Sequence, residues 1–255
     1  MEHELRILYL ELLKRCLTGL IYEDTPAVAI LAGGVIDRAP RQFIRSLREH
    51  GRDLPSHAHT MIGLRRLDNL QHCIETVLAD DIPGDLIETG VWRGGATIFM
   101  RAVLKAHGIT ERTVWAADSF AGLPAADLEC YPVDQHWDRL NLPLAVSLET
   151  VQANFARYQL LDDQVRFLAG WFKDTLPAAP LAQFSVLRLD GDLYESTIDA
   201  LTYLYPKLSP GGFVIIDDYN LPNCRQAVNN YRATHGIGDM IQEIDGWGVF
   251  WRRSG

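Results

Sequence analysis

Residues 184–190 read FSVLRLD and continue as GDLYES, and residues 212–218 read GFVIIDD. Each stretch is a short, mostly apolar run that ends in acidic residues. Runs of this length, rich in β-branched and aromatic side chains, predict strands that are buried on both faces. Such strands are typical of a parallel sheet covered by helices, so these two stretches favour an α/β fold.

Similar short apolar runs, separated by helical patterns, occur along the chain from Asp85 onward. Further apolar runs and intervening helical patterns predict strands at 85–89, 113–118, 164–170, 184–190 and 212–217, and helices near 96–107, 148–158, 196–205 and 225–235. This alternation predicts a doubly wound sheet. Two last segments, 240–244 and 249–252, flank a turn signal and predict an antiparallel hairpin. Five parallel units closed by such a pair favour the seven-stranded methyltransferase variant of the Rossmann-like fold over a dehydrogenase domain.

The first 80 residues lack this rhythm. Apolar residues at helical spacing predict an amphipathic helix over 5–22 and a second helix through Leu64 and Ile74, with a polar stretch, 37–59, between them. We therefore expect a helical extension over 1–80 that covers one side of a domain over 81–255. The first helix would pack either on its own domain or on a second subunit.

Composition limits the class of protein. The chain has 255 residues, of which 47% are hydrophobic and 22% charged, as expected for a soluble globular protein. Its net charge of −9 argues against nucleic-acid and anionic-membrane partners, which require clustered Lys and Arg. The 4 cysteines form no CxxC pair, so neither a disulfide framework nor a zinc site is indicated. No leader pattern or apolar run of about 20 residues is found, which predicts a cytoplasmic enzyme.

Ligands of open parallel sheets bind beyond the carboxyl ends of the strands. The strand at 85–89 leads into ETGVWRGG, residues 88–95, whose glycines allow a tight turn before a helix with free N–H groups. The next strand ends in Asp118, which is placed to accept hydrogen bonds from ribose hydroxyls. A packing turn and a helix-capping aspartate are the alternative. Together the two features indicate a nucleoside cofactor without saying which one.

An acidic cluster follows the strands at 184–190 and 212–217. If these strands are neighbours, three or four of the carboxylates of Asp190, Asp192, Asp217 and Asp218 converge, and they repel one another unless a cation is held among them. Ligands that are all oxygen point to a hard ion, Mg²⁺ first, with Ca²⁺ or Mn²⁺ as substitutes. The alternative is that each aspartate caps a loop.

Several longer motifs occur in one order along the chain. They are TMIG at 60–63, ETGVWRGG at 88–95, DSFAGLP at 118–124, GWFKDTLP at 170–177, LDGDLYES at 189–196 and IDDY at 216–219. On these motifs the chain resembles, over nearly its whole length, the macrocin and mycinamicin O-methyltransferases of macrolide biosynthesis and the related novobiocin sugar methyltransferase. The resemblance implies a class I methyltransferase fold. It also implies an S-adenosylmethionine- and Mg²⁺-dependent O-methyltransferase that acts on a sugar hydroxyl of a glycosylated natural product in antibiotic biosynthesis.

The resemblance also implies residue roles. The expected cofactor-binding residues are Met61, which would close over the cofactor, Glu88 and Gly90 at its methionine end, Trp92 beside them, Asp118 and Ser119 at the ribose, and Gly170 and Trp171 at the adenine. Asp190, Asp217 and Asp218 would hold Mg²⁺, and Asp192 is the candidate general base beside the catalytic ligand Asp190. His136 is a second candidate base, or else an exposed loop histidine.

Three other functions are compatible with parts of the pattern. A dehydrogenase would need G-x-G-x-x-G, whereas residues 90–95 have the spacing G-x-x-x-G-G. A non-catalytic S-adenosylmethionine-binding protein would have no use for the acidic cluster. A catechol-type O-methyltransferase would bind two phenol oxygens to the same metal. We expect specificity to reside in 25–58 and 125–145, and we expect a homo-oligomer; the sequence leaves open which hydroxyl and which scaffold are methylated.

Overall fold

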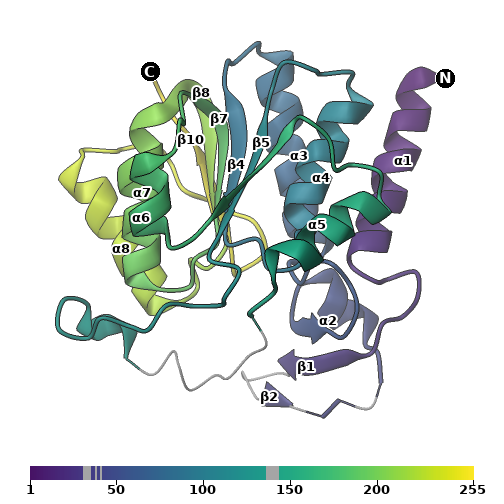
Figure 1. Cartoon of the computed structure of the whole chain (residues 1–255), viewed down its shortest axis with the longest axis horizontal. Helices are drawn as coiled ribbons and strands as arrows, with labels where there is room; N and C mark the ends of the chain where they lie inside the picture. Colours follow the sequence, from purple (N-terminus) through teal and green to yellow (C-terminus); the bar gives the residue numbers. More distant parts are fainter. Residues whose placement is uncertain (31–35, 38, 41, 136–143) are drawn as a thin grey trace.

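The computed structural model describes the whole chain except residues 31–35, 38, 41 and 136–143. Its centre is a seven-stranded sheet with the order β6-β5-β4-β7-β8-β10-β9 (Figure 1). The strands are β4 (Asp85–Thr89), β5 (Val114–Asp118), β6 (Val165–Ala169), β7 (Phe184–Leu189), β8 (Leu208–Ile216), β9 (Gln242–Glu243) and β10 (Val249–Arg252). The first five are parallel, and β10 pairs antiparallel with both β8 and β9. The predicted doubly wound sheet with a closing hairpin is confirmed.

Helices cover both faces of the sheet (Figure 1). One layer holds α3 (Gly63–Ala79), α4 (Gly95–Ala106) and α5 (Leu148–Arg157), with α1 (Glu2–Leu17) packed against α3 and α4, and the other holds α6 (Phe172–Ala178), α7 (Tyr194–Leu204) and α8 (Pro222–Thr234). Successive residues of a strand point to opposite faces, so Val186 joins the core on the first side and Leu187 the core on the second. Among the described helices, none has the length and apolar character that a membrane span needs.

Residues 1–80 contain the two predicted helices and, in addition, a small sheet that was not predicted. Strands β1 (Pro26–Ile30), β2 (Ile36–Asp37) and β3 (Asp53–Pro55) pair antiparallel in the order β2-β1-β3, and the short helix α2 (Arg45–Glu49) precedes β3. Strands of two to five residues are too short to show a period of two in the sequence. The division of the chain at residue 80 stays a prediction.

A buried arginine ties this N-terminal region together. Arg48 is fully buried, and its guanidinium donates to the Asp53 carboxylate at 2.7 Å, to the Thr18 carbonyl at 2.8 Å and to the Asp24 carbonyl at 2.7 Å. The Asp24 carboxylate in turn accepts from the Ala58 N–H at 2.8 Å. The end of α1, β3 and the segment that leads to α3 are therefore held in one hydrogen-bonded unit beside the main sheet.

Candidate active site

One cavity of about 810 Å³ lies beyond the carboxyl ends of the parallel strands. Every predicted site residue that the structure describes lines it: Met61, Glu88, Gly90, Trp92, Asp118, Ser119, Gly170, Trp171, Asp190, Asp192, Asp217 and Asp218. Strand register brings them together, because Thr89 pairs with Leu189 and Leu189 with Ile216, so that the residues after each strand share one edge. His136 lies outside the described residues.

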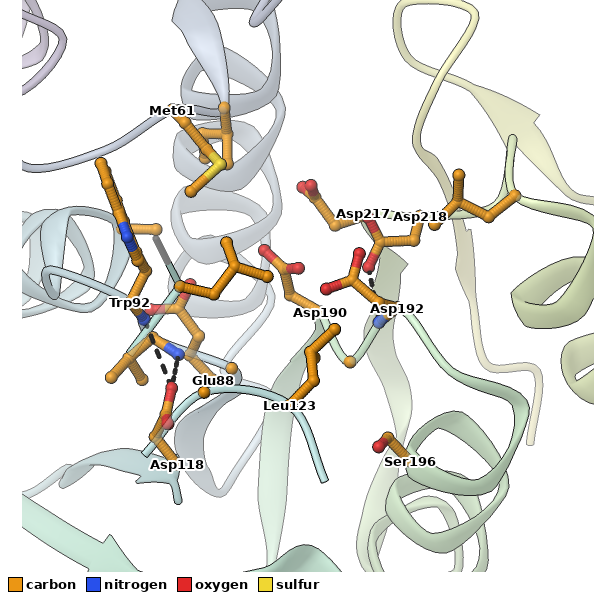
Figure 2. A pocket seen from close by; sticks show the side chains of 18 of the residues that line it. Met61, Glu88, Trp92, Asp118, Leu123, Asp190, Asp192, Ser196, Asp217 and Asp218 are labelled. Atoms are coloured by element: carbon orange, nitrogen blue, oxygen red, sulfur yellow. Dashed lines mark hydrogen bonds between the residues drawn. The ribbon is translucent and has the colours of Figure 1, made fainter. Parts of the chain in front are cut away.

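The turn after β4 needs glycine because β7 ends directly against it. Gly90 has φ +82°, and a Cβ there would lie 1.6 Å from the Asp190 carbonyl oxygen. The Asp118 carboxylate shapes the same turn: it accepts from the N–H groups of Val91 at 2.7 Å and Trp92 at 3.3 Å (Figure 2). Burial raises the pKa of Asp118, and these backbone donors oppose the rise. Asp118 therefore has a structural role besides the predicted contact with ribose.

Glu88 is held at the end of β4 by two partners. Its carboxylate accepts from the Arg188 guanidinium at 2.6 Å and from the Thr97 hydroxyl. Burial raises the pKa of Glu88 to about 7, against the lowering effects of Arg188 and Thr97. Glu88 is thus a fixed, buried part of the cavity wall.

The segment that carries Met61 crosses the N-terminus of α4. The His59 carbonyl accepts from the Gly95 N–H at 2.9 Å, and a Cβ on Gly95 would come within 2.4 Å of that carbonyl oxygen. Arg93 donates to the Ala58 carbonyl at 2.9 Å and stacks on the Trp92 ring, 4.1 Å from its centroid. The segment that carries Met61 is therefore attached to the glycine turn that carries Trp92.

Four aspartates stand together across the cavity from Met61 and Trp92 (Figure 2). Asp190, Asp217 and Asp218 each offer a carboxylate oxygen, and these oxygens all lie within 4.8 Å of one another. Asp192 lies beside them, and its N–H donates to Asp218 Oδ2 at 3.1 Å. β7 and β8 are neighbours, as the predicted convergence of these carboxylates required.

Two arginines that were not predicted partly neutralise this cluster. Arg188 contacts Asp190 at 2.9 Å and also Asp217, and Arg66 pairs with Asp217 from α3. Among the described residues, five carboxylates, including Glu88, share these two guanidinium groups, and Arg66 also pairs with Asp245 at 3.1 Å. The imbalance leaves the cluster short of positive charge.

The pKa values of the cluster reflect this shortage. Burial, followed by the Asp217 carboxylate, raises the pKa of Asp190 to about 6. Burial, followed by the Asp190 and Asp217 carboxylates, raises the pKa of Asp192 to about 7. The pKa of Asp218 is raised well above its usual value by burial and then by Asp192. A cation among these groups would favour their ionised forms.

The donor set fits a hard divalent cation. Carboxylate oxygens bind Mg²⁺ at about 2.0–2.1 Å and Ca²⁺ at about 2.3–2.6 Å, so oxygens on either side of an ion are about 4–5 Å apart. The oxygens of Asp190, Asp217 and Asp218 all lie within 4.8 Å of one another, so they are close enough to surround one such ion. The group consists of three carboxylates and contains no histidine or cysteine, the ligands that softer metal ions prefer.

This strand order, with a glycine turn after β4 and an acidic residue at the end of β5, defines a class I methyltransferase. The model of the macrocin O-methyltransferase (TylF) family matches residues 6–253. The chain belongs to this family and is an O-methyltransferase.

Similar proteins cover the full length of the chain or nearly all of it. A Streptomyces olivaceus enzyme, 8-demethyl-8-(2,3-dimethoxy-alpha-L-rhamnosyl)-tetracenomycin-C 4'-O-methyltransferase, is 61% identical over 100% of this chain and 95% of its own length. Mycinamicin III 3''-O-methyltransferase from Micromonospora griseorubida is 56% identical over 97% of this chain and 96% of its own. The solved structure of the O-methyltransferase NovP superposes with a TM-score of 0.90 at 50% identity, covering 98% of this chain and 100% of that one.

Proposed function

We propose that this enzyme transfers a methyl group from S-adenosylmethionine to a sugar hydroxyl of a glycosylated natural product in antibiotic biosynthesis, with the help of Mg²⁺. One observation carries the proposal: the predicted cofactor residues and a cation-deficient cluster of carboxylates line the same cavity. The relatives support the choice of acceptor, because one is named for methylating a rhamnosyl group of a tetracenomycin.

The cofactor would occupy the side of the cavity formed by β4, β5 and β6. We assign Glu88 and Gly90 to its methionine end with Trp92 beside them, Asp118 and Ser119 to the ribose, and Gly170 and Trp171 to the adenine, because they line the cavity at the ends of β4, β5 and β6. Met61, from the segment before α3, would close over the cofactor. Each oxygen of Asp118 has more than one lone pair, so the carboxylate can accept from ribose while it holds the turn.

Asp190, Asp217 and Asp218 would hold the cation. A divalent ion bound there lowers the pKa of a neighbouring hydroxyl and orients it. Asp192 would accept the hydroxyl proton as the oxygen bonds to the methyl carbon and the sulfur–methyl bond breaks. A cation held by the neighbouring carboxylates would favour the ionised form of Asp192, which is the form that a general base needs. General-base catalysis contributes about 10²- to 10⁴-fold, so Asp192→Asn should lower kcat by that factor and leave S-adenosylhomocysteine binding intact.

The acceptor would enter along an apolar wall. The apolar residues that line the cavity include Val28, Leu47, Leu54, Leu123, Leu144 and Trp247. Such a surface suits the non-sugar part of a glycoside. The tetracenomycin relative is named for a sugar that already carries methoxy groups at positions 2 and 3, so a free vicinal diol is not required by that enzyme. Test acceptors should therefore include both free diols and partly methylated sugars.

A panel assay tests the proposal. The protein is incubated with labelled S-adenosylmethionine and glycosylated natural products or simple catechols, with Mg²⁺ or with excess chelator. We expect metal-dependent labelling of a glycoside. Labelling of catechols alone would support the phenol-methylating alternative, and turnover indifferent to the chelator would remove the metal from the proposal.

We also propose that the enzyme is a cytoplasmic homo-oligomer. The outer face of α1 exposes a row of apolar side chains at helical spacing, Leu5, Leu8 and Leu12, which are 60%, 65% and 56% exposed. A row of this kind favours burial against a second copy. Light scattering should show an oligomer whose mass falls in Leu8→Glu, and an unchanged mass would exclude this face from the interface. Cell fractionation tests the location.

A further inference from the structure

Asp134 caps a helix to which it does not belong. It ends the 3₁₀ turn Pro132–Asp134 and is 1% exposed. Its carboxylate accepts from the N–H groups of Tyr194 at 2.8 Å and Glu195 at 3.2 Å, the first two residues of α7. Helices leave these N–H groups without partners inside the helix. The loop before the undescribed residues is therefore anchored at the start of α7, directly after the Asp190–Asp192 turn.

Asn223 connects this cap to Asp192. It lies in the first turn of α8, is 1% exposed, and donates through Nδ2 to Asp134 Oδ1 at 2.8 Å and to the Asp192 carbonyl at 3.0 Å. Both partners are acceptors, so only the amide nitrogen can face them. Its Oδ1 is buried and has no partner among the described residues. The two donated hydrogen bonds alone therefore set the orientation of this side chain.

The link matters because of the backbone of Asp192. Its φ is +57°, in the left-handed region that residues with a side chain seldom occupy. The N–H of Asp192 is fixed by Asp218, and its carbonyl is fixed by Asn223. The peptide units on both sides are thus held, and the side chain points at the other carboxylates (Figure 2).

We propose that Asn223, oriented by Asp134, is a positioning residue that holds the Asp192 carboxylate where it can accept the proton of the acceptor hydroxyl. The inference rests on the proposed function, because it needs Asp192 to be the base. Neither Asn223 nor Asp134 is among the residues that line the described cavity, so neither contacts the reacting atoms.

Asn223→Ala tests the inference in the full-length enzyme. We expect kcat to fall about 10- to 100-fold, as for a small misplacement of a reacting group, while the affinity for S-adenosylhomocysteine, measured by calorimetry, stays within about 2-fold. Asn230→Ala is the matched control: Asn230 is exposed on the same helix and donates to the Tyr194 hydroxyl at 3.1 Å, whereas the hydrogen bond to the Asp192 carbonyl comes from Asn223. Its kcat should match the wild type, and an equal loss in both variants would overturn the inference.

A double mutant separates positioning from general structural damage. In an Asp192→Asn background, adding Asn223→Ala should leave kcat where the first substitution put it, because the group being positioned no longer takes the proton. If the two losses multiply, the positioning inference fails and the proposed base stands. If Asp192→Asn alone turns over normally, the proposed base fails and the inference fails with it.

Hydrogen exchange gives a readout that does not depend on turnover. The amide of Asp192 should exchange faster in Asn223→Ala than in the wild type, and at the wild-type rate in Asn230→Ala. Unchanged exchange in Asn223→Ala would overturn the inference. Should that variant fail to fold, Asn223→Leu replaces it. Leucine fills similar space but cannot donate to Asp134 Oδ1 or to the Asp192 carbonyl, so the same changes in kcat and exchange are expected.

Discussion

Arg188→Met should destabilise the protein strongly and in a pH-dependent way. Arg188 is 1% exposed, and its guanidinium contacts the carboxylates of Glu88, Asp190 and Asp217. Methionine fills similar space but leaves the buried carboxylates of Glu88 and Asp217, and the partly buried carboxylate of Asp190, without this cation. Removing one partner of a buried ion pair costs about 3–5 kcal/mol. We expect Arg188→Met to lower the free energy of unfolding by this amount at pH 8 in the absence of metal.

The sign of the pH dependence follows from the raised carboxyl pKa values. Glu88 has its pKa raised to about 7 and Asp190 to about 6, chiefly by burial, so the folded state binds protons more tightly than the unfolded chain. Stability from such groups is present at low pH and is lost as pH rises through these values. Removing Arg188 raises both pKa values further. The loss caused by Arg188→Met should therefore be greatest near pH 8 and shrink as pH falls toward 5.

Urea unfolding in the presence of chelator, at several pH values, measures this loss. Arg101→Met is the matched control, because Arg101 is also buried but pairs with Asp162, whose pKa is lowered mainly by that hydrogen bond. Its loss should be smaller and should not grow between pH 5 and 8. A loss below about 1 kcal/mol for Arg188→Met at pH 8, or one that is constant with pH, would refute the reasoning.

Two further predictions concern the turn and the neighbouring wall. Gly90→Ala places a Cβ where the Asp190 carbonyl now lies, 1.6 Å away, so calorimetry should show the loss of S-adenosylhomocysteine binding, and wild-type affinity would contradict the close approach. His59 has its pKa lowered to about 4, first by burial and then by Arg157, so its contribution to stability is present above pH 6.5 and is lost as pH falls toward 4. After allowance for the partial exposure of His59, we expect the free energy of unfolding to fall by about 1–2 kcal/mol over that pH range because of this residue. His59→Asn or His59→Gln should remove this part of the pH dependence. An unchanged pH dependence would exclude His59 as its source.

The strands of the main sheet could be predicted because each is a short run of apolar residues, separated from the next by a helical pattern. The predicted range 85–89 matches β4, and 249–252 matches β10. Helix α6 was missed, because it has seven residues and contains Pro177. The strands around Pro26 and Asp53 were missed because their pairing, rather than a pattern in their own residues, makes them strands.

The carboxylates of the site could be predicted for the same reason, since they follow the strands directly. Their arginine partners could be predicted only in part. Arg188 stands inside an apolar strand, and a buried arginine requires anionic neighbours, so the signal was in the sequence. Arg66 pairs with Asp217 across 151 positions, and nothing in its own helix indicates that partner. The second role of Asp118, which holds the turn at Val91, depends on a loop conformation that the sequence does not specify.

Arg188 joins the two halves of the cavity. Its Nη1 donates both to Glu88 at 2.6 Å, on the side proposed for the cofactor, and to Asp190 at 2.9 Å, on the side proposed for the cation. Its Nη2 donates to Asp217. Any charge that enters one half therefore changes the field felt by a carboxylate of the other half through a shared, buried partner. A divalent ion among the aspartates would neutralise part of the charge that Arg188 now faces there. It would thereby strengthen the ion pair between Arg188 and Glu88. For this reason the cost of Arg188→Met belongs to the whole cluster and cannot be assigned to one of its three ion pairs.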